Sequence, residues 1–335
     1  MSEPLARTVE FKPGERNIFF HILTACNLAC SHCYINPQQH GSRPVDRATL
    51  LAWIKLCFHP AKTNNIVFLG GEPTLHKHLA EAITYAKDLG YESITVDTNG
   101  SCHHDILDNV QPGQVVFNFS LDGPTAPIND AQRGQGSFEV CLSHLKQAIA
   151  KGFDTSVIYT VSQRNIDHLD RMPTLLADLK VPRFFIQVIG LRGKASRQDN
   201  PLQLSPEQWL MKVPVVAKAA ARLGITTFYP KVYLDPDEPF ACAGNVAENF
   251  FIFPNGRVYC CPLCEDLPLH SFAIEGHQLI ERPALTEQQL FGLSIPEGCV
   301  MNKLLQSDNI DYDDTGSPQH RISCCLLKNC VAGIK

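Results

Sequence analysis

The sequence predicts an α/β protein built on a mainly parallel sheet, followed by a small cysteine-rich C-terminal domain. From residue 17 onward, short apolar runs rich in β-branched and aromatic residues alternate with longer stretches in which apolar residues recur every three or four positions. This alternation is typical of repeated strand–helix units. After residue 240 it gives way to short runs, turns and closely spaced cysteines. Right-handed crossovers would wind the units into a barrel or an open doubly wound sheet.

Six strands and four intervening helices are predicted in the first part of the chain. The strands are expected at residues 17–24, 65–69, 93–97, 115–120, 155–161 and 184–189, and the helices at residues 47–58, 78–89, 138–151 and 166–179. A further helix should begin at Ser205 and Pro206, a capping residue followed by a first-turn proline. Near the end, residues 249–253 and 257–260 flank a Pro-Asn-Gly turn and predict a hairpin. We therefore divide the chain into a core at residues 1–200, a connecting helical segment at 201–240 and a cysteine-rich domain at 241–335.

Charge and hydropathy exclude two broad classes of protein. The chain has 335 residues, 44% of them hydrophobic, with a net charge of −5 and a pI of about 6.2. A general nucleic-acid binder needs an excess of basic residues, which this balance does not provide. A membrane span needs about 18 consecutive apolar residues, and neither such a run nor an export signal is found in the sequence. We expect a cytoplasmic protein.

Fourteen cysteines in such a chain favour metal ligation over disulfides, because cytosolic thiols are kept reduced. Three of them form the pattern Cys26-x3-Cys30-x2-Cys33 directly after the first strand, at the end of the sheet where parallel α/β proteins place their active sites. Three thiolates would leave one iron of a cluster free to bind a small molecule, whereas a structural zinc takes four ligands. The alternatives are a zinc site completed by His32 or His40, or three unrelated core cysteines.

The stretch from Thr24 to Tyr34 resembles the cluster loop of the radical S-adenosylmethionine (SAM) superfamily, CxxxCxΦC, with His32 at the Φ position. The resemblance implies a partial (β/α)6 barrel whose three cysteines hold a [4Fe-4S] cluster. It further implies that the open iron binds SAM, and that an electron from a low-potential donor such as ferredoxin or flavodoxin cleaves SAM to a 5′-deoxyadenosyl radical. That radical would abstract a hydrogen from the substrate.

Further segments follow in the order of that family, and the resemblance assigns each of them to SAM. The expected SAM-binding residues are Gly70, Gly71, Glu72 and Pro73 for the amino group, Thr98, Asn99, Ser120 and Asp122 for the ribose and methionine portions, and Arg133 for the carboxylate. Residues 187–190 would lie near adenine. A guanidinium suits a carboxylate because it can bind both oxygens. The simpler alternatives are an ordinary Gly-Gly turn and a solvated loop arginine.

The C-terminal cysteines resemble a second metal-binding region. The spacing Cys242-x13-Gly256-x4-Cys261 is similar to the opening of SPASM and twitch extensions, which hold one or two auxiliary iron–sulfur clusters. The remainder of the SPASM pattern, CxxCx5CxxxC, is incomplete, because only the spacing from Cys324 to Cys330 is kept. Adjacent cysteines rarely both face one cluster, so we expect one auxiliary cluster held by Cys242, Cys261, Cys324 and Cys330. Zinc is the alternative metal.

The resemblance points to a peptide or protein side chain as the substrate, since such extensions are common among peptide-modifying members of the family. The rival substrates are a small cofactor, tetrapyrrole or sugar precursor. Two further classes are a non-catalytic iron–sulfur electron relay and a zinc-dependent structural module. A peptide would be expected to contact the polar segment at residues 192–203 and the hairpin around Gly256. Weaker candidates for the substrate side are His76, His78, His103, His104, Tyr159, Arg192 and Lys194.

Overall fold

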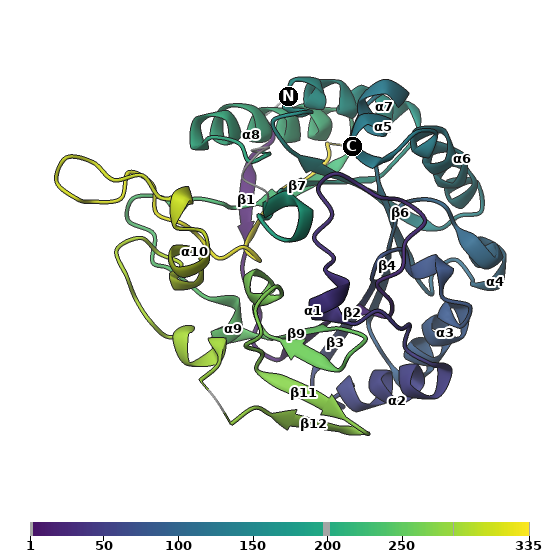
Figure 1. Ribbon diagram of the computed structural model, residues 1–335. Coiled ribbons are helices and arrows are strands. Elements are labelled where there is room, and N and C mark those ends of the chain that lie inside the picture. The colour runs from purple at the N-terminus through teal and green to yellow at the C-terminus, as the bar shows by residue number, and fades with distance from the viewer. Residues whose placement is uncertain (1–2, 197–201, 284, 335) are drawn as a thin grey trace.

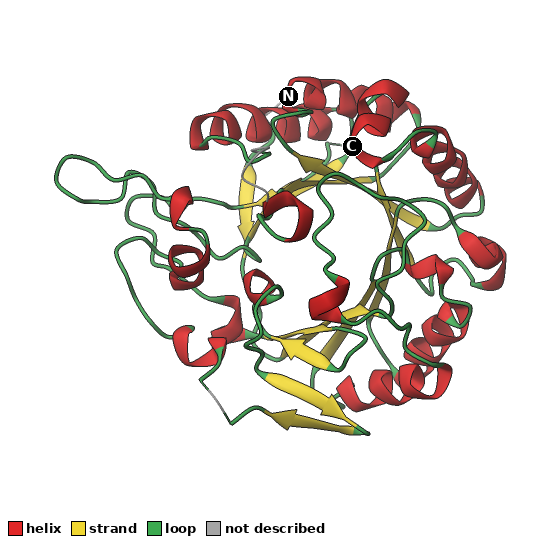
Figure 2. Cartoon of the chain, viewed as in Figure 1, coloured by secondary structure: helices red, strands yellow, loops and turns green. Residues whose placement is uncertain are grey.

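The computed structural model describes residues 3–196, 202–283 and 285–334, and a single sheet organises this part of the chain (Figure 1). The sheet has 13 strands in the order β1-β13-β8-β7-β6-β5-β4-β3-β2-β9-β10-β11-β12. It curves into a ring, with most of the longer helices on its outer side (Figure 2). The C-terminal region lies beside the opening of the ring between β1 and β9 (Figure 1).

Six neighbouring parallel strands form the core of the ring and confirm the predicted strand–helix repeat. They are β2 (Glu15–His21), β3 (Thr63–Leu69), β4 (Ser93–Thr98), β5 (Val116–Ser120), β6 (Asp154–Val161) and β7 (Arg183–Val188). The parallel α/β barrel architecture predicted from the sequence is therefore present.

Helices coincide with the four segments expected between these strands, at residues 47–58, 78–89, 138–151 and 166–179. The helices are α1 (Pro37–His40), α2 (Arg47–Cys57), α3 (Leu79–Leu89), α4 (Ile106–Asn109), α5 (Ala126–Arg133), α6 (Ser137–Ala150), α7 (Met172–Asp178), α8 (Pro206–Arg222), α9 (Ala243–Val246) and α10 (Val300–Leu305). Short 3-10 helices are η1 (Pro73–Leu75), η2 (His103–Asp105), η3 (Ile166–Arg171), η4 (Gly193–Ser196), η5 (Pro262–Cys264), η6 (Glu287–Leu290) and η7 (Ser307–Asn309). The predicted helix at residues 166–179 is divided into η3 and α7.

The segment at residues 201–240 contains more than the predicted helix. Helix α8 begins as expected, with Ser205 accepting a hydrogen bond from the backbone N–H of Gln208 in a capping box. Beyond it, β8 (Thr226–Pro230) pairs in parallel with β7 and adds a seventh parallel strand that the sequence reading did not include. The connecting helical segment expected at residues 201–240 therefore contains a strand as well as its helix.

The C-terminal region extends both edges of the core sheet. On one side, β9 (Glu248–Ile252) pairs in parallel with β2 and forms the predicted hairpin with β10 (Arg257–Tyr259), after which β11 (Phe272–Glu275) and β12 (Gln278–Glu281) follow. On the other side, β13 (Lys328–Val331) lies antiparallel between β8 and β1 (Ala6–Val9). The last strand of the chain thus becomes part of the barrel wall.

The two faces of the sheet differ because side chains alternate along each strand. Phe20, Phe68, Val96 and Phe117 are fully buried on the face that the outer helices cover. The inner face carries polar and partly exposed residues, with Asn65 donating to Asn17, which in turn donates to Asn249. Among the described residues, no helix is long and apolar enough to cross a membrane.

Candidate functional site

The loop carrying Cys26, Cys30 and Cys33 follows β2 at the carboxyl end of the parallel strands. Cys26 is exposed, and Cys30 and Cys33 are half-buried. The pKa of Cys30 is raised to about 11, mainly by burial, with smaller contributions from the Cys33 and Cys26 thiols and an opposing effect of the Arg133 charge. The three sulfur groups are therefore close enough to influence one another, as ligands of one cluster must be.

Glycines in the segment Gly70-Gly71 allow the loop after β3 to approach the cysteine loop closely. The backbone N–H of Gly71 donates to the Leu23 carbonyl at 3.0 Å, and that of Glu72 donates to the Ala25 carbonyl at 3.0 Å. A Cβ atom on Gly71 would lie 2.1 Å from the Ala25 carbonyl oxygen, and Gly70 has a φ of 151°. Side chains cannot be accommodated here, which explains the two glycines.

The buried carboxylate of Glu72 joins the loop after β3 to the loop after β4. It accepts hydrogen bonds from the Thr74 N–H (3.0 Å), the Thr74 hydroxyl (2.6 Å), the Thr98 hydroxyl (2.8 Å) and the Asn99 N–H (2.7 Å). Burial raises the pKa of Glu72, and these donors oppose the increase. Pro73 begins η1 directly after it. The side chain of Glu72 thus positions loops.

Asn99 connects the loop after β4 with the cysteines. Its Nδ2 lies 3.7 Å from the Cys26 Sγ and donates to Asn27 Oδ1 at 2.9 Å. Asn27 in turn donates to the Ser101 hydroxyl at 2.8 Å. Asn99 therefore lies beside the cysteine loop, and the expected contact of Thr98 and Asn99 with SAM stays a prediction.

Asp122 and Arg133 form a buried ion pair behind Cys30. Arg133 Nε lies 2.6 Å from Asp122 Oδ2, although its N–H does not point along a hydrogen-bond direction. Asp122 Oδ1 accepts from the Thr160 N–H at 2.7 Å, and His32 Nε2 lies 3.4 Å from Oδ2. The Cys30 thiol lies 3.9 Å from the Arg133 carbonyl. In the structure the Arg133 guanidinium therefore pairs with Asp122. The expected contact of Arg133 with the SAM carboxylate stays a prediction.

The remaining sides of the cysteine loop are held by α5 and η4. The Ser31 N–H and hydroxyl both donate to Gln132 at 2.9 Å, an anchor that no sequence motif indicates. The Lys194 N–H donates to the Cys33 carbonyl at 2.9 Å. Ser120, the last residue of β5, lies on the same face of the sheet as Asn118, because side chains two residues apart in a strand point to the same side. Loops from four strands thus surround the three thiols.

Arg192 links the cysteine loop to the C-terminal region. Its guanidinium lies over the Tyr34 ring, 4.9 Å from the centroid, and forms an ion pair with Glu265. The Tyr34 hydroxyl bonds to His21 Nε2 at 2.7 Å, and burial lowers the pKa of His21 to about 3. Tyr34 follows Cys33 and Glu265 follows Cys264, so the pair spans the two cysteine regions. Residues 197–201 of the polar segment at 192–203 lie outside the described residues.

Five C-terminal cysteines lie together as a second thiol group, and we call them the auxiliary thiols: Cys242, Cys261, Cys264, Cys324 and Cys325. Successive contacts join Cys264 to Cys261, Cys261 to Cys325, Cys325 to Cys324 and Cys324 to Cys242. These contacts raise the pKa of the Cys242 and Cys264 thiols and lower that of Cys261 and Cys324. Cys299 lies near enough to be affected by Cys261 and Cys324.

The auxiliary thiols differ in part from the expected ligand set. Cys242, Cys261 and Cys324 are brought together as expected. Cys330 instead lies in β13, where it pairs with Phe228 of β8, and it takes no part in these thiol contacts. The adjacent Cys325 contacts both Cys324 and Cys261, against the expectation that neighbours in sequence would face apart. The spacing Cys261-x2-Cys264 could have indicated Cys264.

Both thiol groups have donors that suit iron–sulfur clusters. A cluster takes one thiolate on each iron, so its ligands surround a group of ions. Cys26, Cys30 and Cys33 would hold a cluster with an open iron, and four of the auxiliary thiols would hold a closed one. Among the described residues, no three cysteine, histidine or acidic side chains are arranged to hold a single metal ion.

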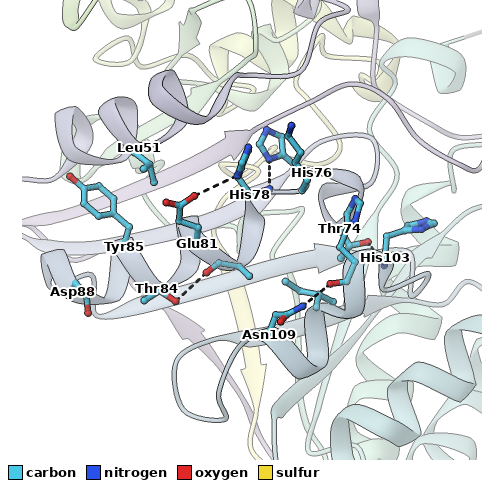
Figure 3. Close-up of a pocket in the computed structure, with 14 residues that line it drawn as sticks. Leu51, Thr74, His76, His78, Glu81, Thr84, Tyr85, Asp88, His103 and Asn109 are labelled. Carbon is cyan, nitrogen blue, oxygen red and sulfur yellow. Dashed lines mark hydrogen bonds and ion pairs between the residues drawn. The ribbon is translucent and has the colours of Figure 1, made fainter.

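All four candidate histidines, His76, His78, His103 and His104, line a pocket next to the Glu72 loop (Figure 3). The pocket has a volume of about 570 Å³ and lies between α2, α3 and η2. His76 Nε2 bonds to the Val45 carbonyl at 2.6 Å, and His78 Nδ1 lies 3.5 Å from Glu81. The Thr74 hydroxyl accepts from the His103 N–H, which ties the pocket to the Glu72 loop. Tyr159 lies outside the site, because it is buried on the helix-covered face and donates to the Asn165 carbonyl.

Comparison with known proteins supports the assignment of the core. The chain is 25% identical over 217 residues to Fe-coproporphyrin III synthase from Methanosarcina barkeri, a match covering 62% of this chain and 52% of that protein. It is 28% identical over 298 residues to mycofactocin maturase MftC from Mycobacterium tuberculosis, covering 83% and 71%. The chain thus spans about half the length of the first relative.

A solved structure shares the fold. SuiB of Streptococcus suis, in a crystal structure with precursor peptide SuiA, aligns with a TM-score of 0.62 at 12% identity, covering 80% of this chain and 63% of that one. The family model of the Radical SAM superfamily matches residues 21–176, which contain Cys26, Cys30, Cys33 and the loops that hold them. Residues 21–176 are therefore a radical SAM domain.

Proposed function

We propose that this chain is a radical SAM enzyme that modifies a side chain of a peptide or protein. The observation that carries the proposal is the loop of Cys26, Cys30 and Cys33, which is held by the Gly70–Glu72 segment, Asn99 and α5 at the carboxyl end of the strands. When bound, the [4Fe-4S] cluster would supply the electron that cleaves SAM to a 5′-deoxyadenosyl radical.

The protein residues would bind and orient SAM. The segment Gly70-Gly71 offers backbone that a ligand can approach closely, because neither residue has a side chain. Glu72 fixes the loop of Thr98 and Asn99 in place. Asp122 and Arg133 form an ion pair next to Cys30, whose thiol contacts the Arg133 carbonyl. A low-potential ferredoxin or flavodoxin is proposed as the electron donor.

The auxiliary thiols are proposed to hold one further [4Fe-4S] cluster, with Cys325 or Cys264 in place of the expected Cys330. More than four thiols in mutual contact exceed the needs of a structural zinc. A zinc site would, however, use thiols of the same kind, so metal analysis decides between the two. We expect the protein to contain iron and sulfide equivalent to more than one cluster. Part of this iron and sulfide should remain after Cys26, Cys30 and Cys33 are all changed to Ala.

The peptide substrate is supported by relatives of two kinds. One relative is named a mycofactocin maturase, and SuiB is seen bound to a precursor peptide. The second candidate substrate is a tetrapyrrole or another small precursor, since another relative is an Fe-coproporphyrin III synthase. A non-catalytic electron relay is disfavoured, because a relay has no need for the loops that surround the three thiols.

The proposal is tested by SAM cleavage in the anaerobically prepared protein. After reduction with dithionite, the protein should convert SAM to 5′-deoxyadenosine and methionine, and Cys30→Ala should abolish the reaction. Cys57→Ala, at a buried cysteine of α2 that belongs to neither thiol group, is the matched control and should retain activity. Cleavage that survives in Cys30→Ala would refute the assignment.

A further inference from the structure

The lumen of the barrel contains a lysine that the proposed SAM site does not use. In the strand register, Lys328 of β13, Phe185 of β7, Asn118 of β5 and Asp97 of β4 all lie on the same face of the sheet. The opposite face packs against the outer helices (Figure 2). All four side chains therefore face the lumen, and Lys328 is contributed by the last strand of the chain.

Lys328 places an ammonium group at this wall. Its Nζ lies over the Phe185 ring, 4.9 Å from the centroid, and the side chain is exposed to the solvent of the lumen. It forms no ion pair with any residue that the structure describes. Enclosure by the barrel lowers the pKa of Lys328, and the charge of Asp97 opposes that decrease.

Asp97 provides an acceptor on the facing wall. One carboxylate oxygen accepts from Asn118 Nδ2 at 2.7 Å, which leaves the other oxygen available. Asp97 immediately precedes Thr98 and Asn99, and Asn99 reaches the Cys26 sulfur. A molecule bound between Lys328 and Asp97 would therefore lie next to the proposed SAM site.

We propose that Lys328 binds a carboxylate of the substrate in the lumen, with Asp97 accepting a hydrogen bond from a neighbouring N–H group of the same molecule. The inference rests on the proposed function, because it takes the lumen to be where the substrate lies. An ammonium with no protein partner gains a charge-assisted hydrogen bond when a carboxylate enters. The Phe185 ring beside it favours an apolar or aromatic group next to that carboxylate.

The chemistry of this pair favours an amino-acid unit, which carries an N–H group close to a carboxylate at the C-terminus of a peptide. A small acid would supply the carboxylate without the N–H. Both sources share the carboxylate, and a set of three simple probes distinguishes them. They are N-acetylphenylalanine, its C-terminal amide and 3-phenylpropionate.

The test is a ligand-observed NMR titration of these probes with the cluster-loaded protein in the presence of SAM. N-acetylphenylalanine should bind at least about tenfold more tightly than its amide, as expected for one charge-assisted contact. Lys328→Met should remove that preference and Lys328→Arg should keep part of it. Lys328→Gln serves as a second neutral variant if Lys328→Met does not fold.

Equal binding of the acid and the amide to the unmodified protein, including no binding of either, would overturn the proposal, as would a preference retained in both neutral variants. A different outcome is that 3-phenylpropionate binds as tightly as N-acetylphenylalanine and that Asp97→Asn does not change the binding of either. This outcome would support Lys328 as the carboxylate site and refute Asp97 as an N–H acceptor. It would favour a small acid as the substrate. SAM cleavage by the unmodified protein tests the proposed function separately. The probes report binding whether or not cleavage occurs.

Discussion

Replacing Glu72 with glutamine tests whether one carboxylate holds two loops of the site together. The carboxylate accepts four hydrogen bonds within the protein, and none of its surface is exposed. In Glu72→Gln, the amide oxygen can keep the three donors now on Oε1. The amide NH2 group would then face the Asn99 N–H, where two donors meet and neither is satisfied.

The expected loss follows from that one contact and the missing charge. Hydrogen bonds to charged groups contribute about 1.5–3 kcal/mol, and an unsatisfied buried donor adds about 1–3 kcal/mol. We expect a decrease of about 3 kcal/mol in the free energy of unfolding. With an unfolding entropy of about 2.1 cal/mol/K per residue, a chain of this length would lose about 4 °C in Tm.

Calorimetry of the anaerobically prepared protein measures this shift, with Glu81→Gln as the matched control. Glu81 pairs with Arg47 on the surface, where ion pairs contribute little, so its Tm should scarcely change. Glu72→Gln should also weaken SAM binding, because Asn99 is no longer fixed beside Cys26. Equal shifts in the two variants, or unchanged SAM binding, would refute the reasoning.

Three further substitutions test other parts of the site. Gly71→Ala should lower both Tm and SAM affinity, because the added Cβ would overlap the backbone of Ala25. The control is Gly292→Ala, at a position with open space around it, which should change neither value in the same melting and binding assays. Cys325→Ser should reduce the iron content and Cys330→Ser should not; the reverse result would restore the ligand set expected from sequence. Arg192→Met should lower the free energy of unfolding by about 3–5 kcal/mol, because it leaves the buried carboxylate of Glu265 without its cation. Denaturant titrations measure this change, and an unchanged midpoint would contradict the role of Arg192 as the partner of Glu265.

The core could be predicted from sequence because its information is local. Each strand of the repeat is followed by its own motif, and parallel strands bring those motifs to the same edge without any knowledge of distant pairing. The loop of Cys26, the segment Gly70-Gly71 and Asn99 therefore lie together as expected. What local patterns could not give was the role of each side chain: Glu72 serves as a link between loops, and Arg133 is engaged with Asp122.

The C-terminal region was harder to predict because its pairings are long-range. β9 joins β2 across more than 200 residues. β13, close to one end of the chain, inserts between β8 and β1, which lies close to the other end. No periodicity within residues 241–335 contains that information. The choice of Cys330 as a ligand followed a spacing rule, whereas the register of β13 places that thiol in the barrel wall.

The insertion of β13 into the barrel wall links the auxiliary thiols to Lys328. Cys324 and Cys325 are the last two auxiliary thiols along the chain, and β13 begins at Lys328, three residues after Cys325. The Leu327 N–H donates to the Cys324 carbonyl at 2.9 Å and the Lys231 N–H donates to the Leu327 carbonyl at 2.9 Å, so the short connection is held at both ends. A metal bound by Cys324 and Cys325 would therefore fix the position at which Lys328 enters the lumen. In this arrangement the auxiliary thiols would contribute to binding of the proposed substrate by holding the backbone next to Lys328 in place, with or without electron transfer through a cluster.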